Sequence, residues 1–599
     1  MFIREITKKN RGYDKPFIYH RLMESLRTPR GPRQRVLLNL GKLDLPREEW
    51  KTLANRIEEI LTGQSCFVPP PDHIESLAQE YAGLLRDKEM RSAPVTEKPS
   101  WETVDLGSLS QGKVRTIGGE AIGYEFFQRL GFPRILGEVG LGEEQIDKAA
   151  LLIIGRLVHP GSERETALWG SKVSGLGELL GADFEHLSPN ALYRVSDLLV
   201  AHQEEIERQL AERERALYGL GERVMLYDLT NAYLAGTGRR SAKAKRGRSK
   251  QKRDDCPLVT LALMIDEEGF PKWSRVLAGN VSEPGTIVEF LQELKGRQRG
   301  LWKPTVVIDA GIATEGTLEA IRGEGFHYIC VSRVRPKEVP GEGLTVIRQG
   351  KESGVEVKRL GHDGEVVLYC HSRGRQEKEE AIKSRMQERF EEGLRGIEVS
   401  LKKRGGVKRY DKVLERVGRL RQRYPSIARF YEVEVEREGE RAGGLRWRIK
   451  EEERLKARFS GSYYLRSDRG DLSDEELWSL YMMLTEVEEA FRCLKSELGL
   501  RPMYHQKDER LEGHMLIGVL GYHLLIAIQR ELRQKGIGHR WETIRRQMAT
   551  QVRVTASVSN EEGERIHIRQ TTEPEAFHEQ IYRAVGMSCR PLKSRRLRK

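Results

Sequence analysis

Three acidic residues stand where carboxylates can do chemistry: Asp228, Asp309 and Glu488. Asp228 closes the apolar stretch "RVMLYDLT" and Asp309 closes "PTVVIDAG", so we expect each aspartate at the end of a short buried strand. Strand ends are where α/β sheets carry their functional sites. Either aspartate alone could instead form a turn or cap a helix, so the pair has to be considered with Glu488.

Glu488 is one of three glutamates in "LTEVEEAFRCLK", and helical geometry separates it from the other two. At about 100° per residue, the apolar residues here form one stripe that should meet a core. The stripe consists of Leu480, Leu484, Val487, Phe491, Leu494 and Leu498. The other two glutamates face water, whereas Glu488 lies at the border with Tyr481, Arg492 and Lys495. The simpler alternative is a surface helix in which Glu488 pairs with Arg492.

The three acids could form one metal site if the fold brings them close together. The first and fourth strands of a mixed sheet are neighbours in one common arrangement, which would bring both aspartates beside the helix of Glu488. Close carboxylates repel by about 4 kcal/mol per pair at an effective dielectric near 20. Mg²⁺ or Mn²⁺ relieves this repulsion, because both ions prefer oxygen ligands. Two such ions, about 4 Å apart, drive phosphodiester chemistry, so the sequence predicts an enzyme that cuts or joins nucleic acid strands.

The distribution of charge also indicates nucleic acid as the partner. The chain has 599 residues and a net charge of +13. Nine of the fifteen residues 239–253 and six of the ten residues 590–599 are Lys or Arg, and neither run contains an acid. Such runs bind polyanions by releasing counterions, although each alone could be a solvated flexible segment.

Other classes of protein are disfavoured. No apolar run reaches the roughly 18 residues that span a bilayer, and Met515–Ile528 is interrupted by glycines and His523, so we expect a buried helix there. The N-terminus lacks the apolar core of a signal peptide. The six cysteines show no CxxC spacing that would suggest zinc or disulfides. We therefore expect a cytoplasmic protein without membrane contact.

The pattern of elements predicts a multidomain α/β protein. Residues 1–48 read as three short antiparallel strands with a basic face, followed by two helices. A mixed five-stranded sheet flanked by helices follows a helical linker domain and is interrupted by a β-rich insertion with a helical middle. A strong helix is expected from about Ser473 to Leu498. The expected divisions are 1–100 (a small N-terminal α+β domain), 101–220 (helical), 221–335 (sheet, first part), 336–464 (insertion), 465–540 (sheet domain, second part) and 541–599 (C-terminal region with a basic tail).

Together these motifs resemble a DDE transposase of a bacterial insertion sequence, most closely the insertion-sequence-four superfamily. The resemblance is carried by "YHRLMESLRTPRGPRQRVLLNLGKL", "YDLTNAYL", "GNVSEPGT", "VVIDAGIATEGTL" and "YMMLTEVEEAFRCLKSELGLRPMYHQKDERLEGHMLIGVLGYHLL". That superfamily's signature is Tyr, two residues, Arg, three residues, Glu, six residues, Lys. Tyr481, Glu488 and Lys495 fit it, but Leu484 stands at the arginine position, where Arg492 is a candidate substitute.

The resemblance implies a ribonuclease-H-like catalytic domain in which the three acids hold two Mg²⁺ ions, with Mn²⁺ able to substitute. Cleavage at the element's end would release a 3′-hydroxyl that attacks target DNA. Tyr481 and Lys495 would position DNA phosphates. Further candidate DNA contacts are Arg492, Arg501, His505, Arg510 and His514, together with Arg246, Arg248, Lys250 and Arg253 of the basic run. Each histidine could instead be a buried, hydrogen-bonded ring.

The remaining implications concern assembly. The N-terminal domain would bind the terminal inverted repeats, the insertion would help to organise the synapse, and two element ends imply a homodimer. Two other functions stay open. A ribonuclease-H-like nuclease or resolvase would use the same acids without strand transfer, and a domesticated DNA-binding protein would have lost the chemistry.

Overall fold

The computed structural model describes residues 1–8, 17–28, 31–62, 69–92, 101–247, 255–281, 285–297, 303–334, 343–349, 354–362, 364–450 and 460–599. The chain divides into two compact units. Unit 1 comprises Met1–Arg213, Leu494–Leu500 and Glu509–Lys599. Unit 2 comprises Glu214–Cys493 and Arg501–Asp508.

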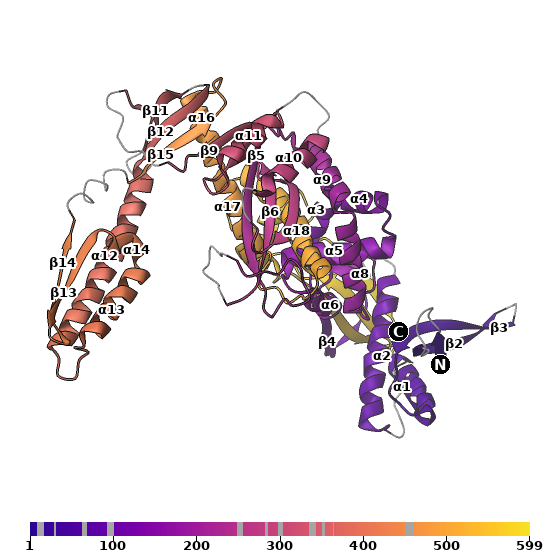
Figure 1. Ribbon diagram of the computed structural model, residues 1–599. Coiled ribbons are helices and arrows are strands. Elements are labelled where there is room, and N and C mark those ends of the chain that lie inside the picture. Colours follow the sequence, from indigo (N-terminus) through magenta and orange to yellow (C-terminus); the bar gives the residue numbers. More distant parts are fainter. Residues whose placement is uncertain are drawn as a thin grey trace. The chain divides into compact units, whose positions relative to one another are not determined.

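Unit 1 begins with a three-stranded antiparallel sheet and two helices (Figure 1). The strands are β1 (Phe2–Lys8), β2 (Phe17–Thr28) and β3 (Gly31–Gly41), and the helices are α1 (Trp50–Thr62) and α2 (Asp72–Ser92). Apolar residues of the sheet and both helices share one core, including Leu22, Leu53 and Ala78. Arg33 and Arg35 of β3 stay exposed. The three antiparallel strands expected within residues 1–48 are confirmed.

The segment 101–220 was expected to be helical, and it is so from Gly118 to Tyr218, whereas Val104–Thr116 forms a strand. Its helices are α3 (Gly118–Arg129), α4 (Phe132–Glu138), α5 (Glu143–Val158), α6 (Glu163–Lys172), α7 (Leu176–Leu180), α8 (Pro189–Ala201) and α9 (Gln203–Tyr218). Helix α5 is buried along most of its length and packs against α3, α6 and α8. This helix is therefore the centre of the helical layer.

The long apolar helix α18 (Asp508–Gln534) is also a core element. By length and composition it could cross a membrane, but 94% of its most apolar window is buried within the protein. A Cβ added at Gly513 would lie 2.0 Å from the Ser196 hydroxyl, so glycine is needed for the close approach of α8. The buried helix expected for Met515–Ile528 is confirmed.

A second sheet in unit 1 was not expected from the sequence. Its antiparallel strands, in order, are β18 (Arg595–Arg598), β17 (Arg565–Thr571), β16 (Val552–Asn560) and β4 (Val104–Thr116), accompanied by α19 (Trp541–Met548) and α20 (Ala576–Ala584). The basic run 590–599 is therefore not a tail along its whole length, because its last part pairs with β17.

Unit 2 is built on a mixed sheet. Its strands are β5 (Val224–Tyr233), β6 (Leu258–Asp266), β7 (Pro271–Ala278), β8 (Thr305–Ile308), β9 (His327–Val331), β10 (Thr345–Arg348), β11 (Val355–His362), β12 (Glu365–Ser372) and β15 (Ser462–Ser467). Their order is β10-β11-β12-β15-β9-β8-β5-β6-β7. The first and fourth strands, β5 and β8, are parallel neighbours as predicted. The sheet has nine strands instead of five, because β15 pairs with β9 and extends it through the insertion.

Helices α10 (Thr286–Arg297) and α11 (Glu315–Gly323) cover one face of this sheet (Figure 1). Tyr227 of β5, Ile308 of β8, Phe290 of α10 and Leu318 of α11 belong to one buried cluster. Helix α17 (Leu484–Arg492) also packs against β5.

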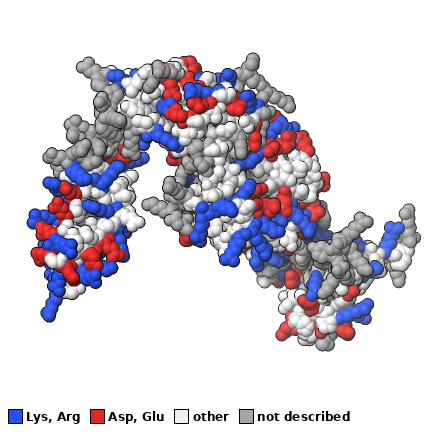
Figure 2. Space-filling view, viewed as in Figure 1, with Lys and Arg blue, Asp and Glu red and all other residues white. Residues whose placement is uncertain are grey.

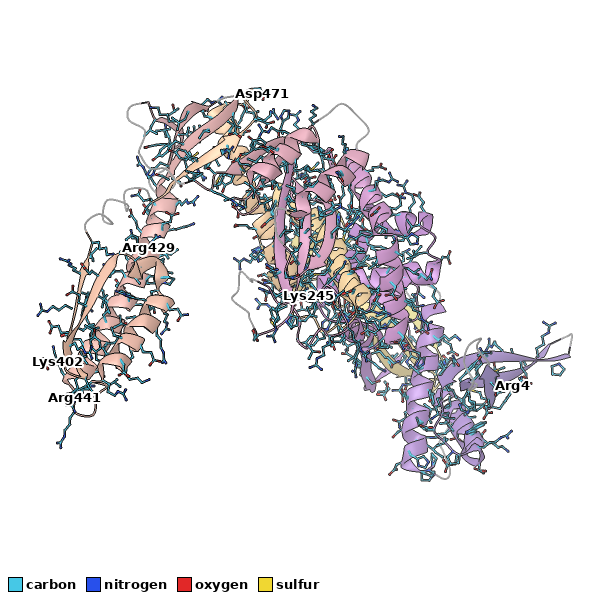
Figure 3. The ribbon with its side chains drawn as sticks, in the orientation of Figure 1. Arg4, Lys245, Lys402, Arg429, Arg441 and Asp471 are labelled. Carbon is cyan, nitrogen blue, oxygen red and sulfur yellow. The ribbon has the colours of Figure 1, made fainter. Side chains whose placement is uncertain are left out.

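The insertion contains a separate core. It comprises α12 (Arg373–Lys402), α13 (Tyr410–Arg423), α14 (Pro425–Ala428) and the hairpin of β13 (Tyr431–Glu438) and β14 (Arg441–Ile449). Its helical middle is larger than expected, with three helices in place of one. Lys402 ends α12, Arg429 directly follows α14 and Arg441 begins β14 (Figure 3). Cations and acids alternate over the surface of the insertion (Figure 2).

The single helix expected from Ser473 to Leu498 is interrupted. Ser473 caps α16 (Asp474–Met482) by accepting the Glu476 N–H at 3.2 Å. The helix then breaks at Met483, resumes as α17 and ends in a π-helical turn, Cys493–Glu497. The apolar period continues through the breaks, which is why the sequence predicts one helix.

Candidate active site

The register of the unit 2 sheet brings two of the predicted acids together. Tyr227 of β5 is paired with Ile308 of β8 in parallel, so Asp228 and Asp309 follow at the same level on adjacent strands. Neighbouring strands are about 4.8 Å apart. Tyr227 and Ile308 point into the core under α10 and α11, and side chains alternate along a strand, so both aspartates point to the opposite face.

Helix α17 supplies the third acid. It packs against β5, and Glu488 lines the same cavity as Asp228 and Asp309. This acidic cavity has a volume of about 570 Å³. Asp228 is 9% exposed, whereas Asp309 and Glu488 are exposed. One oxygen of each aspartate accepts the next residue's N–H at 2.7 Å, which fixes both carboxylates. Asp309 directly follows β8 as expected, but the strand end expected at Asp228 is wrong, because β5 continues to Tyr233 through its pairing with β6.

Tyr481 of α16 also lines the acidic cavity and is half-buried. Burial raises its pKa to about 12, and the negative charges of Asp309 and Glu488 add to the shift, while Arg375 opposes it. The phenol therefore keeps its proton at neutral pH and can donate a hydrogen bond.

The insertion contributes cations to the acidic cavity that sequence reasoning missed: Arg348, Arg375 and Lys378. Arg375 lies in the first turn of α12, 4.7 Å above the ring of Tyr463, and its Nε donates to Glu379 at 2.9 Å. The ring of Tyr463 is 6.1 Å from that of Tyr481. The only sequence signal was a cluster of basic residues at the start of a predicted helix.

The other signature positions are arranged differently. Leu484 lines the acidic cavity and offers no charge. Arg492 donates to Glu489 at 2.6 Å, so the ion pair of this helix uses Glu489 and not Glu488. Lys495 is half-buried in the π-helical turn and belongs to unit 1.

Two of the candidate DNA contacts downstream lie in unit 2. The guanidinium of Arg501 is 5.8 Å from the ring centre of Tyr233, and His505 is half-buried.

The other two lie in unit 1. Arg510 is 2.9 Å from Asp197 and donates to a main-chain carbonyl. His514 is 4% exposed, and its Nδ1 is 3.1 Å from the guanidinium of Arg156. His514 thus matches the alternative of a buried, hydrogen-bonded ring.

The basic run follows β5, as expected. Asp508 accepts the main-chain N–H groups of Ala242 and Lys243 at 3.0 and 3.2 Å, so the start of the run is anchored within unit 2. Arg246 is exposed. Arg248, Lys250 and Arg253 lie outside the described residues.

The donor set of the acidic cavity fits a hard divalent cation. Its four carboxylates, those of Asp228, Asp309, Glu488 and Glu377 of the insertion, offer oxygen ligands, and no histidine or cysteine lines the cavity among the described residues. Oxygen ligands without nitrogen or sulfur are those that Mg²⁺ and Mn²⁺ prefer. Three acids of this kind on one sheet and one helix define a metal-dependent phosphodiester enzyme as the class to expect.

Comparison with known proteins agrees. Residues 219–524, more than half of the chain, match the family described as "Transposase DDE domain", so the chain belongs to that family. Residues 3–68 match "IS1634 family transposase, N-terminal domain". The protein is therefore a DDE transposase of an IS1634-type insertion sequence.

The chain was also compared with solved structures and with curated protein sequences. Among solved structures, one similar chain is in "Cryo-EM structure of piggyBac transposase synaptic complex with hairpin DNA (SNHP)". The two chains are 10% identical with a TM-score of 0.32, and the match covers 75% of this chain and 82% of that one. No curated protein sequence matches significantly.

Proposed function

We propose that this transposase binds the ends of its insertion sequence and catalyses metal-dependent DNA strand cleavage and strand transfer. One observation carries the proposal: Asp228, Asp309 and Glu488, far apart in sequence, line a single cavity. The strand order β9-β8-β5-β6-β7, with β5, β8 and β9 parallel, supports a ribonuclease-H-like catalytic core.

The three carboxylates would hold two Mg²⁺ ions, which activate the attacking oxygen and stabilise the leaving oxygen. Asp228 and Asp309 are fixed by their main-chain hydrogen bonds, so their oxygens are oriented before a metal or DNA arrives. Tyr481, which is protonated at neutral pH, donates a hydrogen bond to a DNA phosphate.

Arg375 takes the phosphate-clamping role that Leu484 cannot perform. A guanidinium donates two parallel hydrogen bonds to a phosphate, and Arg375 lines the acidic cavity with Lys378 beside it. The insertion therefore contributes to the reaction site and not only to assembly.

Other contacts would extend along the DNA. The N-terminal sheet, with exposed Arg33 and Arg35, binds the terminal inverted repeats, and the run 239–253 contacts phosphates near the reaction site. Two element ends require a homodimeric synapse, which acts on the bacterial chromosome in the cytoplasm.

The test is strand cleavage and joining on a duplex that carries the gene's own flanking ends, with Mg²⁺, Mn²⁺ or EDTA. The wild type should release a 3′-hydroxyl and form joined product only with a metal. Asp309→Asn and Glu488→Gln should each lower the rate more than about 100-fold, because even outer-shell metal partners cost 10–100-fold. Glu486→Gln is the matched control, since Glu486 is on the same helix and does not line the cavity.

Cleavage without joining would favour the nuclease. DNA binding without either reaction, unchanged in both variants, would mean that the acids are inert and that the protein only holds DNA.

A further inference from the structure

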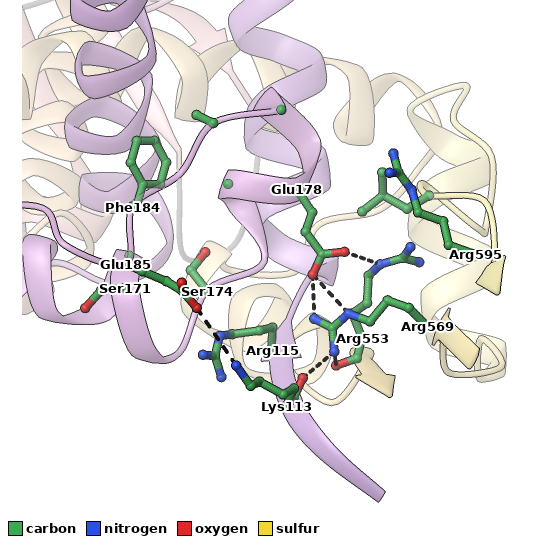
Figure 4. Close-up of a pocket in the computed structure, with 15 residues that line it drawn as sticks. Lys113, Arg115, Ser171, Ser174, Glu178, Phe184, Glu185, Arg553, Arg569 and Arg595 are labelled. Atoms are coloured by element: carbon green, nitrogen blue, oxygen red, sulfur yellow. Dashed lines mark hydrogen bonds and ion pairs between the residues drawn. The ribbon is translucent and has the colours of Figure 1, made fainter. Parts of the chain in front are cut away.

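Unit 1 contains a second cavity with the opposite charge, here called the basic cavity (Figure 4). It has a volume of about 150 Å³, enough for a group larger than one water molecule. Its charged lining residues are the cations Lys113, Arg115, Arg553, Arg569 and Arg595 and the acids Glu178 and Glu185. Five positive and two negative charges leave a net charge of +3.

Two buried arginines that share one carboxylate line the basic cavity. The side chains of Arg553 and Arg569 are 1% and 7% exposed, and both pair with Glu178. Nε of Arg553 donates to this carboxylate at 2.6 Å and Nε of Arg569 at 3.1 Å. Burial raises the pKa of Glu178, but the two arginines together hold it below the ordinary value. Two buried cations therefore share one ionised acid, and one positive charge is uncompensated.

The backbone at Lys113 directs another cation to the basic cavity. Its φ is 52°, a left-handed conformation that is uncommon for a residue other than glycine. The pairing of β4 with β16 shifts register here, between the Arg553 and Thr555 pairs, as expected of a bulge. Bulges of this kind re-aim a side chain, often beside a functional site. The Lys113 ammonium is 3.9 Å from Glu185, and its carbonyl accepts a hydrogen bond from Arg569.

Arg595, the first residue of β18, adds a further positive charge to the lining of the basic cavity. Among the described residues its side chain has no hydrogen bond or ion pair, and it is only half-exposed. Burial lowers the pKa of Arg553, Glu178 opposes this shift, and the positive charges of Arg569 and Arg595 add to it. An anion bound here would relieve this repulsion.

We propose that the basic cavity binds a phosphate group of the DNA backbone. Arginine forks match the geometry of a phosphate. DNA is the source of phosphate to test first, because the chain belongs to a transposase family. The inference rests on the proposed function only in taking DNA as the ligand.

The test uses the full-length protein in EDTA, so that no strand is cut. Fluorescence anisotropy measures the affinity for a short duplex of arbitrary sequence between roughly 50 and 200 mM salt. Arg595→Ala should weaken binding by about 3- to 10-fold and reduce the salt slope by about one, as expected for one lost phosphate contact. Arg595→Lys should restore most of the affinity, which a merely unfolded variant would not do.

Arg583→Ala is the matched control, because Arg583 is a largely exposed arginine of unit 1 that does not line the basic cavity. Its affinity and salt slope should stay at wild-type values. Inorganic phosphate is the second probe, and it should raise the melting temperature of the wild type and not that of Arg595→Ala.

Unchanged duplex binding by Arg595→Ala and Arg595→Glu would overturn the proposal. If inorganic phosphate still bound the wild type in that case, the cavity would take free phosphate and not DNA. Because EDTA removes catalysis from the assay, a protein that binds as expected but never cleaves would defeat the proposed function and leave this inference intact.

Discussion

At the scale of single residues, the acidic cavity contains a leucine where the superfamily signature has an arginine, and it contains an arginine from another element. Leu484 projects from α17 into the cavity, where it cannot bind a phosphate. Arg375 reaches the same cavity from α12 and lies over Tyr463, whose ring is 6.1 Å from that of Tyr481. The cation that is missing at position 484 of α17 is thus present on another element.

This arrangement predicts a rescue. Arg375→Ala should slow single-turnover cleavage by about 10- to 100-fold, because a charge-assisted hydrogen bond is worth about 1.5–3 kcal/mol. Adding Leu484→Arg to that variant should recover part of the rate. Arg385→Ala is the control, because Arg385 lies on α12 and does not line the cavity. A full rate in Arg375→Ala would contradict the assignment of Arg375, and a failed rescue would show that position 484 cannot supply the charge.

The three acids could be predicted from the sequence because each has a local signature. Asp228 and Asp309 each follow a short apolar run, and Glu488 lies at the border of an apolar stripe. Arg375 has no such signature, since its contact with Tyr463 depends on how the insertion returns to the sheet. Residues placed by local pattern are visible in one sequence, and residues placed by tertiary contact are not.

At the scale of elements, the same distinction explains the missed sheet of unit 1. The segment "RRLR" looks like part of a solvated basic tail, yet it is β18 and pairs with β17. Strand formation by such residues depends on the neighbouring strand more than on intrinsic propensity. The extra strands of the unit 2 sheet were hidden similarly. The insertion was predicted to be β-rich, and β11 and β12 lie within it, but β10 and β15 were not predicted, and β15 is the strand that joins β12 to β9.

His567 makes the stability of this sheet depend on pH. The ring is 1% exposed, and its Nδ1 is 2.7 Å from the Ser557 hydroxyl. Burial lowers its pKa from 6.5 to about 4, and the charges of Arg86, Arg565 and Lys599 contribute. Between these values the unfolded chain binds a proton that the folded chain does not. The free energy of unfolding should therefore fall as pH drops from 6.5 to 4, by about 3 kcal/mol at 1.36 kcal/mol per pKa unit.

Hydrogen exchange of the β16 and β17 amides, measured across this pH range, would detect the loss. His567→Gln should have a smaller pH dependence than the wild type, whereas Ser557→Ala, which retains the ring, should keep it. Equal slopes for the wild type and His567→Gln would show that another group controls the effect.

At the scale of the whole molecule, a net charge of +13 matters only through where its excess is concentrated. Most cations of the insertion alternate with acids, and many form ion pairs, such as that of Arg448 with Glu432. The excess lies instead in the run 239–253 and around the basic cavity. Each phosphate that such cations contact releases counterions, so their contributions to the salt dependence of DNA binding should add.

This additivity gives a final prediction. A plot of log affinity against log salt should be linear and steep for the wild type, with a slope of about −0.9 per phosphate contacted. Changing Arg246, Arg248, Lys250 and Arg253 together to Gln should reduce the slope by up to about four, and adding Arg595→Ala should reduce it by about one more. Asp309→Asn and Glu488→Gln should leave the slope unchanged, because they remove no phosphate contact. A flat plot for the wild type would mean that its cations form ion pairs within the protein and do not contact DNA phosphates. The proposed phosphate contacts would then be wrong.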